Sequence, residues 1–337
     1  MTAERIFTVA GKEFTDHLTS RKFLVILALL LMFALLGMHQ GIDQYNQNLE
    51  SYNQQLQAAG DSTGPGMMPD RPSILLIFMQ LVSSLVAFGG MLAIATGFDL
   101  ISKEKETRSL KTLLAHPIFR DEIINGKALG GAAALGVALV IAFAITLAVL
   151  LVCSIVPTAD EVAGIGFLGL ASFMYLLAFF ALALALSVVT KESGHAMVYG
   201  LALFFALAYV LPMFGMVLGG MVAGDPPQRP EMPAWTDADG RTHISGDVAV
   251  LKAYEEECDR YDAEMKTYQN KKQFVTDTVN LFSPMMNYNA VVHTIVDPLD
   301  TPEGAASRIW GSLAALVVFP SVFFAAAYGK FMRMDIR

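Results

Sequence analysis

Six long apolar runs restrict the fold of this chain more than any other feature. They cover residues 23–38, 74–98, 128–156, 167–189, 197–221 and 308–328. A transmembrane helix needs roughly 20 predominantly apolar residues to cross the hydrocarbon core. Only 16% of the 337 residues are charged, whereas soluble domains have about a quarter. We therefore expect an all-α polytopic membrane protein with six transmembrane helices.

The segment before the first apolar run has the pattern of an amphipathic helix. Its apolar residues fall on one helical face, with charged residues elsewhere; they are Ile6, Val9, Ala10, Phe14 and Leu18. Such a helix lies in the membrane–water interface. We expect an N-terminal elbow helix over residues 1–22, on the cytoplasmic surface; a solvated tail is the alternative. Residues 23–222 then hold spans one to five.

Two polar segments carry apolar residues at alternating spacings of three and four, the pattern of a coiled-coil seam. One is a helix at 41–58, which continues outward from the first span; the other begins near Val248. The seam residues are Tyr45, Leu49, Tyr52 and Leu56 in the first, and Leu251, Tyr254, Cys258, Tyr261, Met265 and Tyr268 in the second. We expect the two seams to pack on each other or across a dimer; two independent amphipathic helices on the lipid surface are the alternative.

The second seam lies in a hydrophilic block over residues 223–307, between spans five and six. The block opens with a proline-rich stretch, GDPPQRPEMPAW, and holds 15 of the chain's 31 acidic residues. This block is expected to be an extracytoplasmic, coiled-coil-like helical insertion. Residues 308–337 then form the sixth span and a cytoplasmic tail.

The basic residues predict the orientation. With six spans, the N-terminus, the 99–127 segment, the turn at Lys191 and the tail lie on one side and hold 14 of the 23 Lys and Arg. The short loops on the other side hold one, Arg71. Because short cytoplasmic loops are enriched in Lys and Arg, we expect both termini to lie in the cytoplasm. The protein itself is expected in the plasma membrane.

Several function classes lack their sequence signals. No phosphate-binding G-x-x-x-x-G-K-[ST] loop, metal-ligand spacing or nucleophile motif occurs. The spans contain essentially no Asp, Glu, Lys or Arg, although ion-coupled carriers and proton pumps need such residues. We expect no enzymatic activity, no catalytic, cofactor or metal site, no disulfide framework and no nucleic-acid partner. Energy for any transport would come from another polypeptide.

The charged segment 99–127 resembles the signature of type-2 ABC permeases. In that family the loop between spans two and three runs roughly Glu-x-Glu-x-Gly-Thr-Leu-x-x-Leu-Leu, then Pro, Arg and Gly-Lys. The matching residues are Glu104, Glu106, Leu110, Leu113, Leu114, Pro117, Arg120, Gly126 and Lys127. Arg108 stands where the family has Gly, and Ser109 where it has Thr, which leaves the local turn geometry open. The segment is most similar to permeases of nitrous oxide reductase maturation systems.

The resemblance implies a partner and a docking site. Two copies of this chain would form a homodimer, each docked to a separate ATPase subunit that holds ATP and Mg. Residues 118–126 would form a coupling helix in a groove of that ATPase, with an apolar face that includes Ile118, Phe119, Ile123 and Ile124. Residues implied in coupling are Glu104, Glu106, Leu113, Leu114, Pro117, Ile118, Phe119, Arg120, Glu122, Ile123, Gly126 and Lys127.

Two functions follow as hypotheses. The first is the membrane subunit of an ABC exporter. The second is a mechanical transmitter of the same architecture, in which the external helices act on an extracytoplasmic protein and nothing crosses the bilayer. The sequence does not reveal a substrate.

Overall fold

The computed structural model describes residues 2–59, 72–108, 119–236, 242–244, 247–296 and 305–334. The chain divides into two compact units: unit 1 is Met1–Leu207 with Pro284–Arg337, and unit 2 is Ala208–Ser283. Six helices in the described residues are long and apolar enough to cross a membrane. They are Arg21–Gln57, Leu75–Glu106, Arg120–Val152, Ala159–Val189, Ser193–Ala223 and Ile309–Met332. The expectation of six spans is confirmed.

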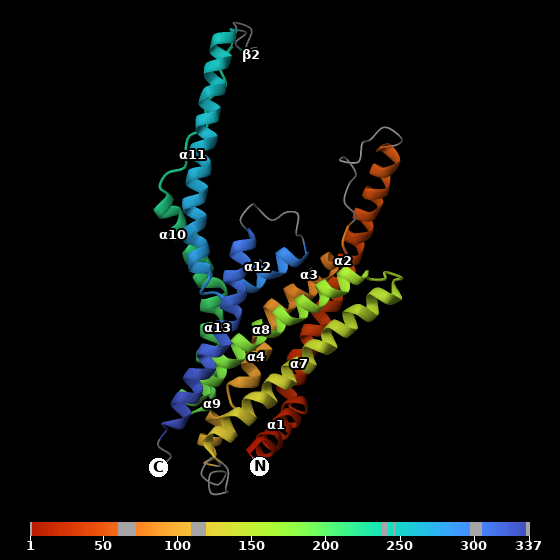
Figure 1. Ribbon diagram of the computed structural model, residues 1–337, viewed down its shortest axis with the longest axis vertical. Coiled ribbons are helices and arrows are strands. Elements are labelled where there is room, and N and C mark those ends of the chain that lie inside the picture. Colours follow the sequence, from red (N-terminus) through yellow and green to blue (C-terminus); the bar gives the residue numbers. More distant parts are fainter. Residues whose placement is uncertain are drawn as a thin grey trace. The chain divides into compact units, whose positions relative to one another are not determined.

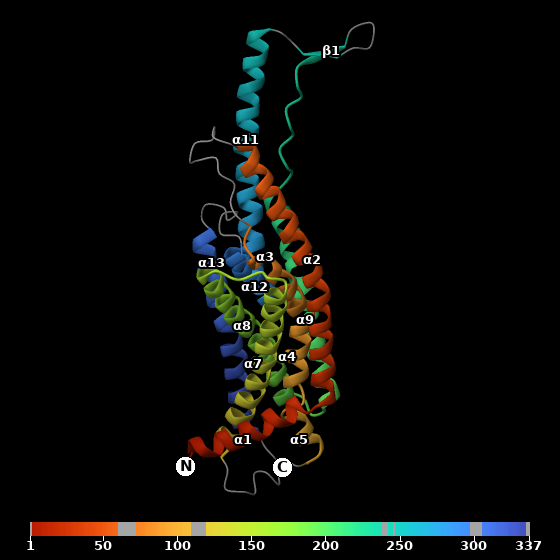
Figure 2. The ribbon, with the colours of Figure 1, turned by 90° about the vertical axis from the view of Figure 1, so that its right-hand side faces the viewer.

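Unit 1 is a helical bundle. Its helices are α1 (Thr2–Leu18), α2 (Arg21–Ala59), α3 (Leu75–Ser84), α4 (Gly90–Gly97), α5 (Ser102–Glu106), α7 (Arg120–Val152), α8 (Ala159–Val189), α9 (Ser193–Phe205), α12 (Pro284–Val296) and α13 (Ala305–Met332). A π-helical turn at Leu85–Gly89 joins α3 to α4. Both chain ends lie at the same end of this unit (Figure 1), which we call the basal end. There α1 crosses the foot of the bundle near α5 (Figure 2).

The core of unit 1 is centred on α8. Tyr175 of α8 stacks on Tyr288 of α12 with ring centroids 4.8 Å apart, and both side chains are fully buried. Each hydroxyl group has a partner: Tyr175 donates to the carbonyl of Val86 in the π-helical turn at 3.0 Å, and Tyr288 lies 2.7 Å from Ser172 Oγ. Buried polar groups need such partners. The end of the hydrophilic block, Pro284–Val296, thus belongs to the core of unit 1.

Unit 2 consists of α10 (Leu211–Ala223), β1 (Ala234–Thr236), β2 (Thr242–Ile244) and α11 (Val248–Asn280). The helices α10 and α11 lie side by side (Figure 1). Their close approach depends on Gly219, where a β-carbon would lie 2.5 Å from Thr276 Oγ1. The strands pair antiparallel, Ala234 with Ile244. These strands add one short antiparallel pair to a structure that is otherwise helical in the described residues.

The seam residues are the less exposed face of their helices in both polar segments. On α11 the six predicted seam positions are half-buried, whereas all the remaining positions from Val248 to Lys271 are exposed. The proline-rich stretch before β1 has a matching face, with half-buried residues at every third position: Pro227, Pro230 and Pro233. Pro227 and Tyr268 line one groove. Three residues of a polyproline helix span about 9.3 Å and seven helical residues about 10.5 Å. The prolines therefore match the heptad repeat of the tyrosines, Tyr254, Tyr261 and Tyr268.

On α2, Tyr45 is buried, and Leu49, Tyr52 and Leu56 are half-buried. These four positions thus share the less exposed face of α2 in this segment. The pairing of the α2 and α11 seams stays a prediction, because the two helices belong to different units.

Candidate functional site

The candidate site is the basal end of unit 1, where the charged segment after the second span meets α1, α7 and the turn between α8 and α9. The structure describes this segment on both sides of residues 109–118. Of the residues implied in coupling, Leu113, Leu114, Pro117 and Ile118 therefore lie outside the described residues.

A buried ion-pair cluster joins α5, α7 and α1. Lys127 has only 4% of its side chain exposed, and its ammonium group lies 2.8 Å from Glu104 Oε1 and contacts Glu13 Oε1. Taking a charge out of water is costly unless it is paired and hydrogen-bonded. Lys127 and Glu104, two of the residues implied in coupling, are paired with each other within this chain, and Lys127 also contacts Glu13.

Lys105, the residue after Glu104, binds the end of α8. Its ammonium group donates to the carbonyl oxygens of Ser187, Val188 and Thr190 at distances of 2.5–3.1 Å. The last carbonyl groups of a helix have no partner within the helix, and a cation there also interacts favourably with the helix dipole. Lys105 therefore fixes the C-terminus of α8 to α5.

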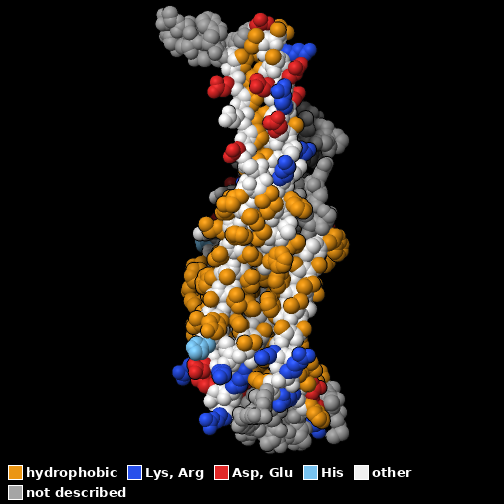
Figure 3. Space-filling view, turned by 90° about the vertical axis from the view of Figure 1, so that its left-hand side faces the viewer, with side chains coloured by type: hydrophobic (Ala, Val, Ile, Leu, Met, Phe, Trp, Pro, Cys, Tyr) orange, Lys and Arg blue, Asp and Glu red, His pale blue; other side chains and the backbone are white. Residues whose placement is uncertain are grey.

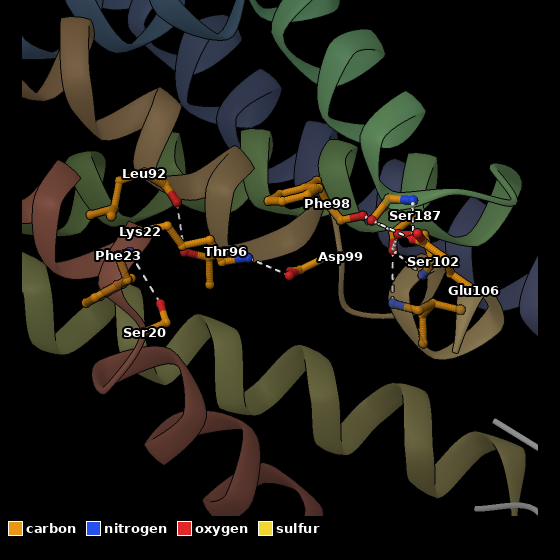
Figure 4. Close-up of polar contacts among 12 residues, drawn as sticks. Ser20, Lys22, Phe23, Leu92, Thr96, Phe98, Asp99, Ser102, Glu106 and Ser187 are labelled. Carbon is orange, nitrogen blue, oxygen red and sulfur yellow. Dashed lines mark hydrogen bonds and ion pairs between the residues drawn. The ribbon is translucent and has the colours of Figure 1, made fainter. Parts of the chain in front are cut away.

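Two serine contacts complete the attachment of α5 to the α8–α9 turn. The backbone N–H groups of Ile101 and Ser102 both donate to Ser187 Oγ at 2.9 Å. Glu106 Oε2 accepts hydrogen bonds from Ser193 Oγ at 2.7 Å and from its backbone N–H at 3.3 Å, at the start of α9. Ser102, Ser187 and Glu106 appear together in Figure 4. Three consecutive residues of α5 thus connect it to other helices. Glu104 connects it to α7 and, through Lys127, to α1. Lys105 connects it to α8, and Glu106 to α9.

A second contact joins α2 to the end of the second span. Lys22 Nζ lies 2.5 Å from Asp99 Oδ2 and 4.3 Å from the centre of the Phe98 ring (Figure 4). The pair fixes the first turn of α2 beside the segment that leads into α5.

The expected separate coupling helix at 118–126 is not a separate element. Residues from Arg120 onward form the first turns of α7, which continues unbroken to Val152. Phe119 precedes it, and its N–H donates to the Glu122 carboxylate at 3.0 Å, which satisfies one of the free amides at the helix start. The expectation that Phe119 and Ile123 share a partner-facing surface is corrected: Phe119 is 65% exposed, whereas Ile123 is completely buried, as is Ile124.

Gly126 has a packing role against α1. A β-carbon at this position would lie 2.7 Å from Val9 Cβ and 3.0 Å from the carbonyl oxygen of Ile6. Gly130, one turn further along α7, approaches the carbonyl of Ala10 in the same way, at 2.6 Å. The Gly-Lys pair therefore provides close contact through Gly126 and an ion pair through Lys127, both directed at α1.

Arg120 and Arg108 take distinct roles. Arg120 donates to the carbonyl groups of Met332 and Met334 at 3.2 and 2.7 Å, which connects α7 to the end of α13. Arg108 has a backbone φ of +58°. That left-handed conformation favours glycine, which explains the Gly of the family pattern at this position.

The Ser187 and Ser193 contacts carry no signal in the sequence, because both serines belong to a different stretch of the chain.

Comparisons with known proteins show the family of this chain. The family model of the ABC-2 family of transporter proteins matches residues 7–336. The chain is also 29% identical, over 219 residues, to the probable ABC transporter permease protein NosY of Pseudomonas aeruginosa; this covers 63% of the chain and 71% of that protein. In ABC transporters of this family the ATPase activity resides in a separate subunit. This chain is a multi-pass membrane protein that belongs to the ABC-2 transporter family, as a permease subunit.

Proposed function

We propose that the chain is the permease subunit of an ABC exporter, powered by a separate ATPase that binds at the basal end of unit 1. The observation that carries this proposal is the set of contacts made by α5. Glu104, Lys105 and Glu106 connect this one short helix to α7, α8 and α9, and Lys127 of α7 extends the connection to α1. A displacement of the segment by a partner would therefore move α1, α7, α8 and α9 together.

Fewer of the residues implied in coupling are exposed to a partner than the sequence implied. Phe119 is exposed beside this cluster, whereas Ile123, Gly126 and Lys127 are buried against the rest of unit 1. We propose that Phe119 contacts the ATPase, and that the buried residues pass the movement to α1. Two ATPase copies, binding ATP and Mg, would serve a homodimer of this chain.

The orientation that accompanies this proposal places the basal end in the cytoplasm. Figure 3 shows hydrophobic side chains over the middle of the face in view, and Lys and Arg gathered below them. Basic residues favour the cytoplasmic side of a membrane protein. In that orientation α1 lies on the cytoplasmic membrane surface as an elbow helix, and the chain between spans five and six begins and ends on the outer side.

The test of ATPase docking is a single substitution at the exposed position. Phe119→Asp places a charge in the proposed contact, and we expect loss of ATPase co-purification and of ATP hydrolysis by the complex. Phe274→Asp is the matched control, because Phe274 is 74% exposed on α11 in unit 2. Unchanged assembly and hydrolysis of the Phe119→Asp complex would rule out this docking site.

A second candidate function is a mechanical transmitter that moves no substrate. The proline and tyrosine rows of unit 2 support it, since they make a stiffened helical arm. Deletion of residues 227–268 removes both rows and leaves the α11 residues that pack on α10, such as Thr276. If the chain is a transmitter, the deletion abolishes function while ATP hydrolysis continues. A deletion variant that still exports would exclude the transmitter role.

A further inference from the structure

A groove of about 560 Å³ lies between α7 and α13 in unit 1, with α8 as its floor. The floor is closed, because Phe180 and Ala181 of α8 are only 3% and 4% exposed. The rims are open: Leu129 of α7 is 49% exposed, and Val317 of α13 is 54% exposed. Neither the ion-pair cluster nor the proposed ATPase contact uses any of these four residues.

The floor and both rims of the groove are parts of transmembrane spans. The lining residues of these helices fall within 125–132 on α7, 174–181 on α8 and 317–324 on α13. At 1.5 Å per residue, each stretch lies within about 23 Å of the basal end of its helix. Because the hydrocarbon core is about 30 Å thick, the groove faces the lipid tails of the leaflet at the basal end.

The polarity of the lining changes along the groove. Asn125 lies at its basal end, one residue before Gly126, which packs on Ile6 of α1. Ser321 lies further from that end, and its hydroxyl group donates to the Val317 carbonyl of its own helix at 2.7 Å. The other lining residues are apolar. The groove thus offers a free polar group only near the level of phospholipid ester groups, and it is apolar at the level of the tails.

Water and a protein helix both fit this groove poorly. Apolar cavities stay dry, and this groove opens into hydrocarbon. Dividing its volume by the length of each lining stretch, about 10.5 Å, gives a cross-section of roughly 50 Å². An α-helix with its side chains is about 10–12 Å across and needs about 80–110 Å². A helix of a second copy would therefore lie on the rims without reaching the floor, whereas a single hydrocarbon chain reaches it.

We propose that the groove binds an acyl chain of a phospholipid from the leaflet at the basal end, with the chain on Phe180 and Ala181 and an ester carbonyl at the Asn125 amide. That amide has two N–H donors. Lipid tails are as apolar as the groove, so the chain does not enter to escape water. It enters because an empty groove leaves the lining side chains without dispersion contacts on one side. This inference requires only that the chain spans a membrane, and it stands whether or not an ATPase binds at Phe119.

The test uses the full-length chain reconstituted in phosphatidylcholine vesicles. A small fraction of the lipid carries a photoreactive diazirine near the middle of one acyl chain, and mass spectrometry of peptides locates the adducts after irradiation. We expect adducts at Phe180 and Ala181 on the floor, as well as at Val140, which is 67% exposed on α7. Phe179 is the negative control, because it is completely buried against Tyr175 and Phe204. Labelling of Phe180 no higher than that of Phe179 would overturn the proposal.

A substitution that fills the groove locates the site. Ala132→Trp places a large side chain among the lining residues, so labelling of Phe180 should fall to the level of Phe179 while labelling of Val140 remains. Ala133→Trp is the matched control, because Ala133 is the next residue of α7, is exposed and does not line the groove. Labelling of Phe180 that survives Ala132→Trp would contradict the assignment. If that variant does not fold, the wild-type comparison of Phe180 with Phe179 decides the proposal.

Disulfide trapping separates the lipid from a second copy of the chain. Val317→Cys places a thiol on the rim, in a chain whose Cys153 and Cys258 are replaced by Ser. We expect no cross-linked dimer after oxidation in membranes. A dimer cross-linked at position 317, together with absent labelling of Phe180, would show that a second copy covers the groove and would overturn the lipid assignment.

Discussion

The buried ion-pair cluster of Lys127 provides the sharpest test of how the basal end is held together. Among the described residues, Lys127 is the only cation that contacts both Glu13 and Glu104, and Lys127→Met removes it. The side chains of Glu13 and Glu104 are 12% and 20% exposed. Removing one partner from a buried cluster costs about 3–5 kcal/mol, because the remaining charges are left without a counterion. For a chain of this length we expect the midpoint of thermal unfolding to fall by about 4–7 °C.

The design separates charge burial from packing. The triple variant Lys127→Met, Glu13→Leu, Glu104→Leu has no charge left in this cluster, so most of the lost stability should return, because an apolar replacement of a buried ion pair is often neutral. The assay is thermal unfolding of the full chain in detergent, monitored by fluorescence-detected size-exclusion chromatography. Lys191→Met is the control at an exposed lysine. If Lys127→Met unfolds at the same temperature as Lys191→Met, the cluster does not hold α1 on α7.

Four further predictions concern the same end of unit 1. Arg108→Gly relieves a left-handed backbone at φ +58° and should stabilise the chain by up to about 1 kcal/mol after the added flexibility of the unfolded state; an unfolding midpoint that falls would refute this. Lys105→Met leaves three carbonyl groups of α8 without their donor and should cost about 1–3 kcal/mol, whereas Lys103→Met, at an exposed neighbour, should cost almost nothing in the same unfolding assay. Gly126→Ala places a β-carbon 2.7 Å from a side-chain carbon of α1, so hydrogen exchange of α1 amides should accelerate, at a cost of about 1–3 kcal/mol; unchanged exchange would contradict the close approach. Because burial lowers the pKa of His17, the unfolded chain binds its proton more tightly, and stability should fall as the pH drops below about 6.5, the ordinary histidine value; His17→Gln should remove that part of the pH dependence.

The sequence predicted the elements of this fold well where one local pattern dominated. The six spans follow from apolar runs, and α1 and the seam faces of α2 and α11 follow from helical spacing, because these signals arise within a few turns of one helix. At Arg108, where the family pattern has Gly, the sequence left the turn geometry open, and the structure has a positive φ there. The strands β1 and β2 were not predicted, because each spans only three residues.

The roles of individual charged residues could not be predicted in the same way. A lysine in a basic segment has the same local sequence signal whether it faces a partner or is buried in its own chain. Lys127 pairs with a glutamate 114 positions away, and Lys105 binds carbonyl groups 82–85 positions away. Such pairings depend on which helices lie next to one another.

The sequence alone therefore determined that this chain crosses a membrane six times, carries a basic segment between spans two and three and belongs with type-2 ABC permeases. Burial of apolar side chains in lipid is a property of each run by itself, so no tertiary information was needed. Only the tertiary structure decided that Gly126 and Lys127 hold α1, that Ile123 is enclosed and that Phe119 is exposed. These outcomes depend on contacts between distant segments, and the cost of leaving a buried charge unpaired selects which of them form.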